Sequence, residues 1–119
     1  PLMALYPDGG FALTMGTPGG DSQTQSLLQI AHNMMIFGMT PQQAIEAPRF
    51  RSSRGFSVAI EDRMKPEVLS RLESLGHSLQ VIPGWTATFG GAQMIFYDRD
   101  TEVLTAAADP RREAYSLAY

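Results

Sequence analysis

Two pairs of apolar stretches, each interrupted by a short polar turn, predict two β-hairpins. Residues 2–6 and 11–15 flank Pro7-Asp8-Gly9-Gly10, in which proline presets φ, aspartate can cap its own backbone and glycine accepts a positive φ. Residues 92–97 and 102–108 flank residues 98–101 in the same way. The first two stretches are apolar at both odd and even positions, so we expect their strands to lie centrally in a sheet with both faces covered.

Apolar residues recur at helical spacing in three further places. Asp21 or Ser22 is expected to cap a helix that runs to about residue 37 and ends at Gly38. Thr40-Pro41 has the residue types of an N-cap and a first helical position, and predicts a short helix over 42–47 that stops at the next proline. Residues 66–75 predict a third helix, closed by the glycine that follows.

The remaining segments predict single strands and connections. Residues 56–60 and 78–82 have strand patterns, whereas 49–54 is expected to be a basic, polar connector and 83–91 a loop. Two hairpins, these strands and about three helices predict an α+β fold with a mainly antiparallel sheet. The length fits a single domain over residues 1–119. Because the chain opens without methionine in a strand-like stretch, we expect it to be a piece of a longer polypeptide.

Charge and composition narrow the range of functions. The formal net charge is −3 and no lysine or arginine cluster is present, which argues against nucleic-acid binding. The chain has no cysteine, and no apolar run approaches the roughly 18 residues of a membrane span. The histidines, His32 and His77, are far apart and have no ligand-spaced partners, so neither a metal nor another cofactor is predicted.

Other candidate groups have simpler explanations. The charges at 61–63 and 98–100 and the pair Arg111-Arg112 are expected to be solvated surface groups. Pro1 is a weak candidate for a general base, and no G-x-S-x-G elbow supports a serine nucleophile.

The stretch Met15-Gly16-Thr17-Pro18-Gly19-Gly20-Asp21 carries the clearest chemical signal. It joins an apolar strand to the longest predicted helix through a glycine-rich loop, which gathers backbone N–H groups at the positive end of a helix dipole. Such a loop suits a bound anion or an oxyanion that develops during a reaction. It also occurs where a strand and a helix simply meet closely, so a non-catalytic anion-binding or scaffold domain remains the alternative.

Several segments together resemble the γ-glutamyltranspeptidase (γ-glutamyltransferase) family. The family's G-[ST]-P-G-G loop corresponds to residues 16–20, and its G-M-x-x-x-x-A-x-x-A-P-R-F segment to residues 38–50. Residues 107–111, A-A-D-P-R, and the terminal Leu117-Ala118-Tyr119 resemble the family's D-P-R…G-Y ending. The resemblance covers essentially the whole chain, and the order and spacing of the segments make it specific.

The resemblance implies a portion of an N-terminal-nucleophile (Ntn) hydrolase with an αββα sandwich. Members of the family cleave themselves into two subunits and expose a threonine that attacks γ-glutamyl amides such as glutathione, forming an acyl-enzyme. It further implies that Gly19 and Gly20 supply the oxyanion-hole amides and that Thr17 and Pro18 position the loop. The partners would be the rest of the small subunit, the large subunit and a small γ-glutamyl substrate, with self-association of the fragment as a further expectation.

Some family features are missing or altered. The nucleophilic threonine and the serine pair that usually binds the substrate carboxylate would both precede Pro1, so the chain is expected to be inactive alone. Asp21 stands where the best-known members have serine. This T-P-G-G-D variant is similar to the broader branch that includes acylases of other amides. The resemblance suggests a periplasmic or secreted protein, with the cytoplasm as the other possibility.

Overall fold

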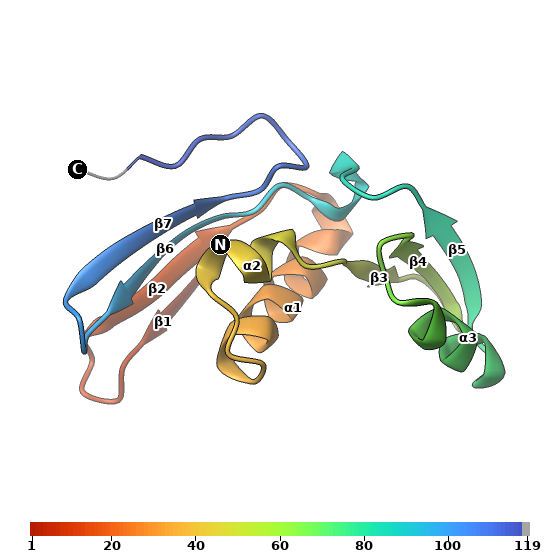
Figure 1. Cartoon of the computed structure of the whole chain (residues 1–119), viewed down its shortest axis with the longest axis horizontal. Coiled ribbons are helices and arrows are strands. Elements are labelled where there is room, and N and C mark those ends of the chain that lie inside the picture. Colours follow the sequence, from red (N-terminus) through yellow and green to blue (C-terminus); the bar gives the residue numbers. More distant parts are fainter. Residues whose placement is uncertain (118–119) are drawn as a thin grey trace.

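The computed structural model describes residues 1–117 and contains two separate β-sheets (Figure 1). The larger sheet has the strand order β1-β2-β6-β7, and every neighbouring pair is antiparallel. Its strands are β1 Leu2–Leu5, β2 Phe11–Gly16, β6 Gln93–Asp98 and β7 Val103–Ala108. They form the two hairpins predicted from the sequence, joined side by side through β2 and β6.

The smaller sheet has the order β3-β4-β5. Its strands are β3 Phe50–Ser52, β4 Ser57–Glu61 and β5 Ser78–Ile82. β3 and β4 are antiparallel, whereas β4 and β5 are parallel and are connected through the helix α3, Pro66–Ser74. The prediction of a polar connector over 49–54 was therefore wrong, because β3 forms within it. The expected loop over 83–91 also contains a short 3₁₀ helix, η2 Ala87–Phe89.

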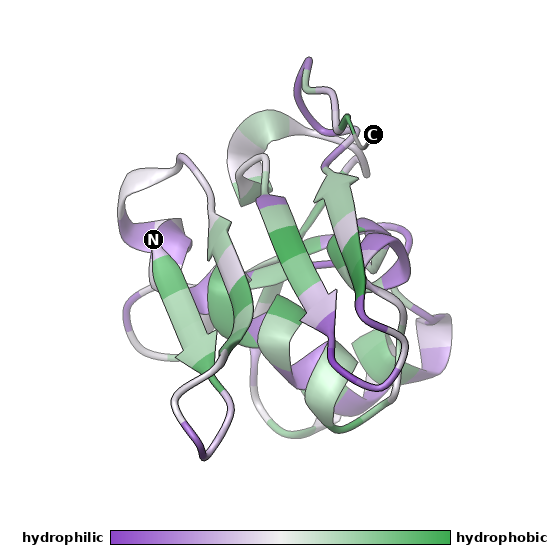
Figure 2. Ribbon diagram, turned by 90° about the vertical axis from the view of Figure 1, so that its left-hand side faces the viewer, coloured by the Kyte–Doolittle hydropathy of each residue, from purple (hydrophilic) through white to green (hydrophobic). Residues whose placement is uncertain are grey.

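Helices α1, Gln23–Met35, and α2, Pro41–Glu46, cover one face of the larger sheet (Figure 1). The covered face presents one cross-strand row of four apolar side chains in register: Leu2, Met15, Met94 and Ala107. Ile30 and Ile45 from the two helices are fully buried against this face. Figure 2 shows apolar residues along the strands and polar residues at the hairpin turns. Burial of this layer is the main stabilising contribution of the fold.

The opposite face of the larger sheet is open in the described residues. It presents Met3, Thr14, Ile95 and Ala106 in a second cross-strand row. Met3 is 65% exposed and Ile95 is 46% exposed. β1 is an edge strand, so the prediction that both strands of the first hairpin lie centrally was wrong for β1. Its two-sided apolar pattern reflects a second face that is apolar but not covered by residues 1–117.

The starts of the two N-terminal helices differ from each other. α2 begins as predicted, with a capping box between Thr40 and Gln43 and with Pro41 in the first turn. α1 is preceded by a 3₁₀ turn, η1 Gly20–Ser22, and has no side-chain cap. The predicted cap at Asp21 or Ser22 was wrong, since the Ser22 hydroxyl donates backwards to the Gly19 carbonyl. Within residues 1–117, no helix is long and apolar enough to cross a membrane.

Candidate active site

The glycine-rich loop joins the end of β2 to η1 and requires glycine at two successive positions. Gly19 has φ of 135°, and a Cβ atom there would lie 2.3 Å from the Ser22 Oγ. Gly20 has φ of 53°, in the left-handed region, although a Cβ atom there would meet nothing within 4 Å. A side chain is therefore excluded at Gly19 by space and backbone conformation, and disfavoured at Gly20 by backbone conformation alone.

The hydrogen bonds of the loop leave its donors free and engage its acceptors. The Pro18 carbonyl accepts from the Thr17 hydroxyl at 3.0 Å. The Gly19 carbonyl accepts from both the Ser22 amide, at 3.0 Å, and the Ser22 hydroxyl, at 2.8 Å. In the described part of the chain, the N–H groups of Gly19 and Gly20 have no hydrogen-bond partner. Two successive amides beside the N-terminal end of α1 are thus available to a negatively charged oxygen.

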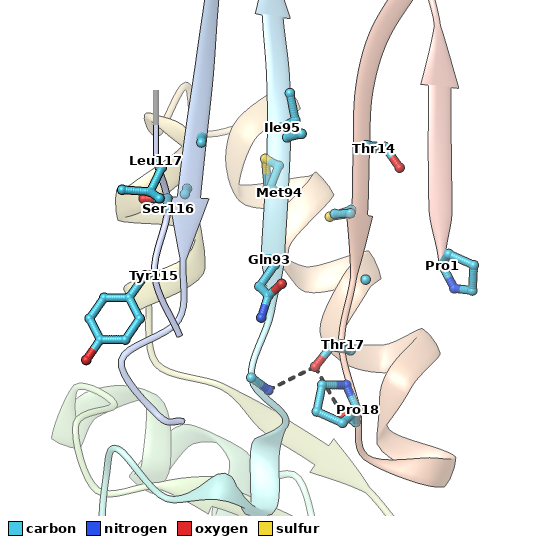
Figure 3. A pocket seen from close by; sticks show the side chains of 15 residues that line it. Pro1, Thr14, Thr17, Pro18, Gln93, Met94, Ile95, Tyr115, Ser116 and Leu117 are labelled. Carbon is cyan, nitrogen blue, oxygen red and sulfur yellow. Dashed lines mark hydrogen bonds between the residues drawn. The ribbon is translucent and has the colours of Figure 1, made fainter. Parts of the chain in front are cut away.

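A groove on the open face of the larger sheet leads to this loop (Figure 3). It has a volume of about 610 Å³ and is lined by strand residues that include Thr14, Gln93 and Ile95. Thr17 and Pro18 line it where the loop begins, and Gly19 and Gly20 follow immediately along the chain. The C-terminal segment contributes Tyr115 to one side, and Pro1 contributes to the other (Figure 3).

The segment before β6 buttresses the loop from the side. The Gly91 amide donates to the Thr17 hydroxyl at 2.9 Å. Gly90 has φ of 91°, and a Cβ atom there would lie 2.3 Å from the Thr17 Oγ1 and 3.0 Å from the Pro18 carbonyl. Phe89 is fully buried, and its carbonyl accepts from the Ser26 hydroxyl of α1. The loop is therefore held between α1 and a segment more than sixty residues away in the sequence.

A buried ion cluster fixes that segment in turn. Arg49 and Asp109 are each 1% exposed and form an ion pair at 2.8 Å. The same guanidinium donates to the Phe89 carbonyl at 2.9 Å, and Asp109 accepts from the Ala92 amide at 3.0 Å. These hydrogen bonds therefore hold both ends of the segment 89–92 in place. Burial, the largest influence, lowers the pKa of Arg49 from its usual value, while the charge of Asp109 opposes this effect.

Glu61 and Arg111 complete the cluster, and both were wrongly predicted to be solvated. Glu61 is fully buried and Arg111 is 4% exposed. Arg111 Nε donates to Glu61 at 2.6 Å, and its Nη1 pairs with Asp109 at 3.1 Å. Burial alone would lower the pKa of Arg111, but the hydrogen bond that Arg111 donates to Glu61 and the charge of Asp109 outweigh it and raise the pKa. Burial is tolerated because each charge has an opposite partner and further backbone hydrogen bonds.

The sequence singled out the glycine loop but missed this cluster. Its members come from the connection between α2 and β3, from the end of β4 and from the C-terminal segment, so no local pattern joins them. A signal was nevertheless present, since Arg49 lies in the A-P-R-F segment and Asp109 and Arg111 lie in the D-P-R segment.

The histidines and acidic residues form no metal site in the described residues, where no group of three potential ligands comes together. His32 is exposed and lies edge-on to Phe37, with ring centroids 5.2 Å apart. His77 lies edge-on to Phe56 at 5.8 Å. Ala118 and Tyr119, part of the terminal segment noted above, lie outside the described residues.

Comparison with known proteins places the chain in a family. Its sequence matches the family model for gamma-glutamyltranspeptidase over residues 1–119. It is 30% identical over 113 residues to the glutathione hydrolase proenzyme of Bacillus subtilis (strain 168), covering 95% of this chain and 19% of that protein. The chain spans about a fifth of the length of the curated relatives it matches.

Solved structures agree with this placement. The γ-glutamyltranspeptidase from Pseudomonas nitroreducens complexed with L-DON superposes with a TM-score of 0.85 at 23% identity, covering 100% of this chain and 61% of that one. The cephalosporin acylase from Bacillus halodurans superposes with a TM-score of 0.81 at 32% identity, covering 87% and 19%. The helical layer on a mainly antiparallel sheet is thus a portion of an Ntn-hydrolase fold. Because the family match spans every residue, the chain belongs to the γ-glutamyltranspeptidase family.

Proposed function

We propose that this chain is the C-terminal part of the small subunit of an Ntn-type γ-glutamyl transferase or hydrolase, in the branch with a T-P-G-G-D loop. Its contribution is the oxyanion-hole loop. The observation that carries the proposal is the pair of Gly19 and Gly20 amides, which have no partner within residues 1–117 and lie beside the N-terminal end of α1 in a chain of this family.

The proposed reaction uses a nucleophile from outside this chain. A threonine Oγ at the start of the small subunit attacks the amide carbonyl carbon, and the carbonyl electron pair moves onto its oxygen. The Gly19 and Gly20 N–H groups donate to that oxyanion, where preorganised donors act most strongly. The carbonyl then re-forms, the C–N bond breaks and the amine leaves with a proton. Water or an acceptor amine finally releases the acyl group, so this chain alone would be inactive.

Two substrate classes compete for this site. γ-Glutamyl amides such as glutathione follow from the family and from the glutathione hydrolase relative. Other acyl amides are favoured by the 32% identity to a cephalosporin acylase and by Asp21, which is exposed one residue after Gly20 and makes no cap bond in the described chain. A carboxylate at that place disfavours a substrate with its own negative charge near the loop.

The activity test uses the complete protein that carries this chain. After self-cleavage, it should release p-nitroaniline from γ-glutamyl-p-nitroanilide or product from a neutral acyl amide, measured as initial rates on both. A higher kcat/KM on one class assigns the substrate. Absence of product from every simple γ-glutamyl and acyl amide, in protein that has cleaved itself, would remove the basis for the proposal.

The open sheet face is the proposed docking surface for the rest of the enzyme. Exposed apolar side chains there, among them Met3 and Ile95, are costly in water unless another part of the protein covers them. The partners we propose are the remainder of the small subunit and the large subunit.

Self-association should follow when this chain is produced alone. We expect size-exclusion chromatography with light scattering to report dimers or larger species, and Ile95→Lys to shift them towards monomer because its charge faces the open surface. Leu28→Lys is the matched control. Leu28 is 67% exposed and lies on α1, the helix that packs on the opposite face of the sheet. A wild-type chain that elutes as a stable monomer would contradict the docking role of this face.

A further inference from the structure

Two hydroxyl groups hold the two carbonyls that share peptide planes with the proposed oxyanion donors. Thr17 Oγ1 donates to the Pro18 carbonyl at 3.0 Å, and Ser22 Oγ donates to the Gly19 carbonyl at 2.8 Å. The Pro18 carbonyl belongs to the same peptide unit as the Gly19 amide. The Gly19 carbonyl belongs to the same unit as the Gly20 amide.

The planar geometry of the peptide unit links each carbonyl contact to the direction of an N–H group. The described chain contains no cis peptide bond, so in each unit the C=O and N–H bonds point in opposite directions within one plane. A hydrogen bond that fixes the carbonyl therefore fixes the direction of the N–H. Glycine alone would leave these planes free to rotate, because it lacks the side chain that restricts φ and ψ in other residues.

We propose that Thr17 and Ser22 are positioning residues that aim the Gly19 and Gly20 amides, one hydroxyl for each amide; this inference rests on the proposed function. Neither hydroxyl touches the substrate in this role. Each acts on the opposite side of the peptide plane from the oxyanion.

The contacts of Thr17 leave its hydroxyl one orientation. The Gly91 amide donates to Oγ1 at 2.9 Å and so occupies a lone pair, and the hydroxyl hydrogen is then directed to the Pro18 carbonyl. The ion pair of Arg49 and Asp109 holds the segment that contains Gly91. The cluster therefore holds Gly91 in place, the Gly91 amide orients the Thr17 hydroxyl, and that hydroxyl sets the direction of the Gly19 amide.

Ser22 has a comparable but more enclosed setting. It is 1% exposed, and its amide and hydroxyl both donate to the Gly19 carbonyl. Rotation of the Gly19–Gly20 peptide would break both bonds and leave a buried hydroxyl unpaired, which is unfavourable. The hydroxyl that the sequence offered as a helix cap is used instead to fix the peptide in front of the helix.

The test compares hydroxyl-deleting variants in the complete protein, with the two subunits co-expressed as separate chains so that self-cleavage is not required. Thr17→Val and Ser22→Ala should each lower kcat about 10- to 100-fold, with KM changed by no more than about twofold, because the oxyanion exists only in the transition state and intermediate. Thr17→Ser keeps the hydroxyl and should restore most of kcat. Thr40→Val deletes a hydroxyl that caps α2 and should reduce stability without lowering kcat.

The outcomes separate this inference from the proposed function. If wild-type protein is active and Thr17→Val and Ser22→Ala keep the wild-type kcat, the positioning role is wrong while the enzyme assignment stands. A fall in kcat that Thr17→Ser does not reverse, or that Thr40→Val matches, would indicate a general structural effect and also overturns the role. Wild-type protein inactive on every amide overturns both.

Discussion

Replacing Gly20 by valine should lower kcat on the preferred amide by about 10²–10³-fold, the usual effect of losing one oxyanion donor. Gly20 has φ of 53°, a conformation that a β-branched residue avoids at a cost of about 1–2 kcal/mol. The peptide would rotate to relieve this strain and carry the Gly20 amide away from the oxyanion. A Cβ atom at this position would meet nothing within 4 Å, so a clash of the Cβ atom does not contribute to the loss.

A second glycine provides a matched control for that strain. Gly38 has φ of 66°, and a Cβ atom there also meets nothing within 4 Å, but it follows the far end of α1. Gly38→Val should therefore destabilise the protein about as much as Gly20→Val while leaving kcat unchanged. Initial rates and thermal unfolding of both variants give the comparison. Equal kcat in the two variants would show that the Gly20 amide takes no part in the reaction.

Local sequence rules predicted the elements whose determinants lie close together in the chain. The turn Pro7-Asp8-Gly9-Gly10 and the tetrapeptide at 98–101 each place their flanking strands in a confirmed hairpin. Thr40 and Pro41 likewise start α2, since both capping partners lie within one turn of the helix. The fold class followed from these elements, and the family comparison supports it.

Long-range contacts account for the failures. Glu61 and Arg111 have the composition of surface charges, and only the approach of segments fifty residues apart pairs and buries them. Ser22 satisfies every local rule for an N-cap, yet the loop before it presents the Gly19 carbonyl at 2.8 Å from its hydroxyl. The apolar pattern of β1 is a property of an entire sheet face, which a single strand cannot reveal.

For the candidate site, too, the sequence predicted the local features but not those that depend on long-range contacts. The sequence indicated the loop and assigned its residues: Gly19 and Gly20 as donors, and Thr17 and Pro18 for positioning. Those roles stay predictions. What the sequence could not supply is the direction of each amide, because it depends on contacts from Ser22 and from Gly91, the latter 74 residues away from Thr17.

Asp109→Asn should lower the free energy of unfolding by about 3–5 kcal/mol, the usual cost of removing one partner from a buried ion pair. This is a large fraction of the roughly 5–15 kcal/mol that stabilises a typical domain. The amide has nearly the same shape as the carboxylate, so the loss comes from charge. In the described part of the chain, Arg49 would lose its acidic partner and Arg111 would keep only its pair with Glu61, and an amide NH₂ would face groups that are themselves donors.

The chain contains its own control for this charge effect. Asp8 pairs with Arg99 at 2.6 Å, a shorter distance than the 2.8 Å between Arg49 and Asp109, but the side chains of Asp8 and Arg99 are 60% and 43% exposed. Solvent screens that pair, so Asp8→Asn should change the unfolding midpoint far less than Asp109→Asn. Urea unfolding of both variants of the complete protein, followed by circular dichroism, measures the difference. Similar small shifts in the unfolding midpoint for both variants would mean that removing a charge from the buried cluster costs no more stability than removing one from an exposed ion pair. A large shift for Asp109→Asn alone would identify burial, rather than contact distance, as the property that makes this ion pair important for stability.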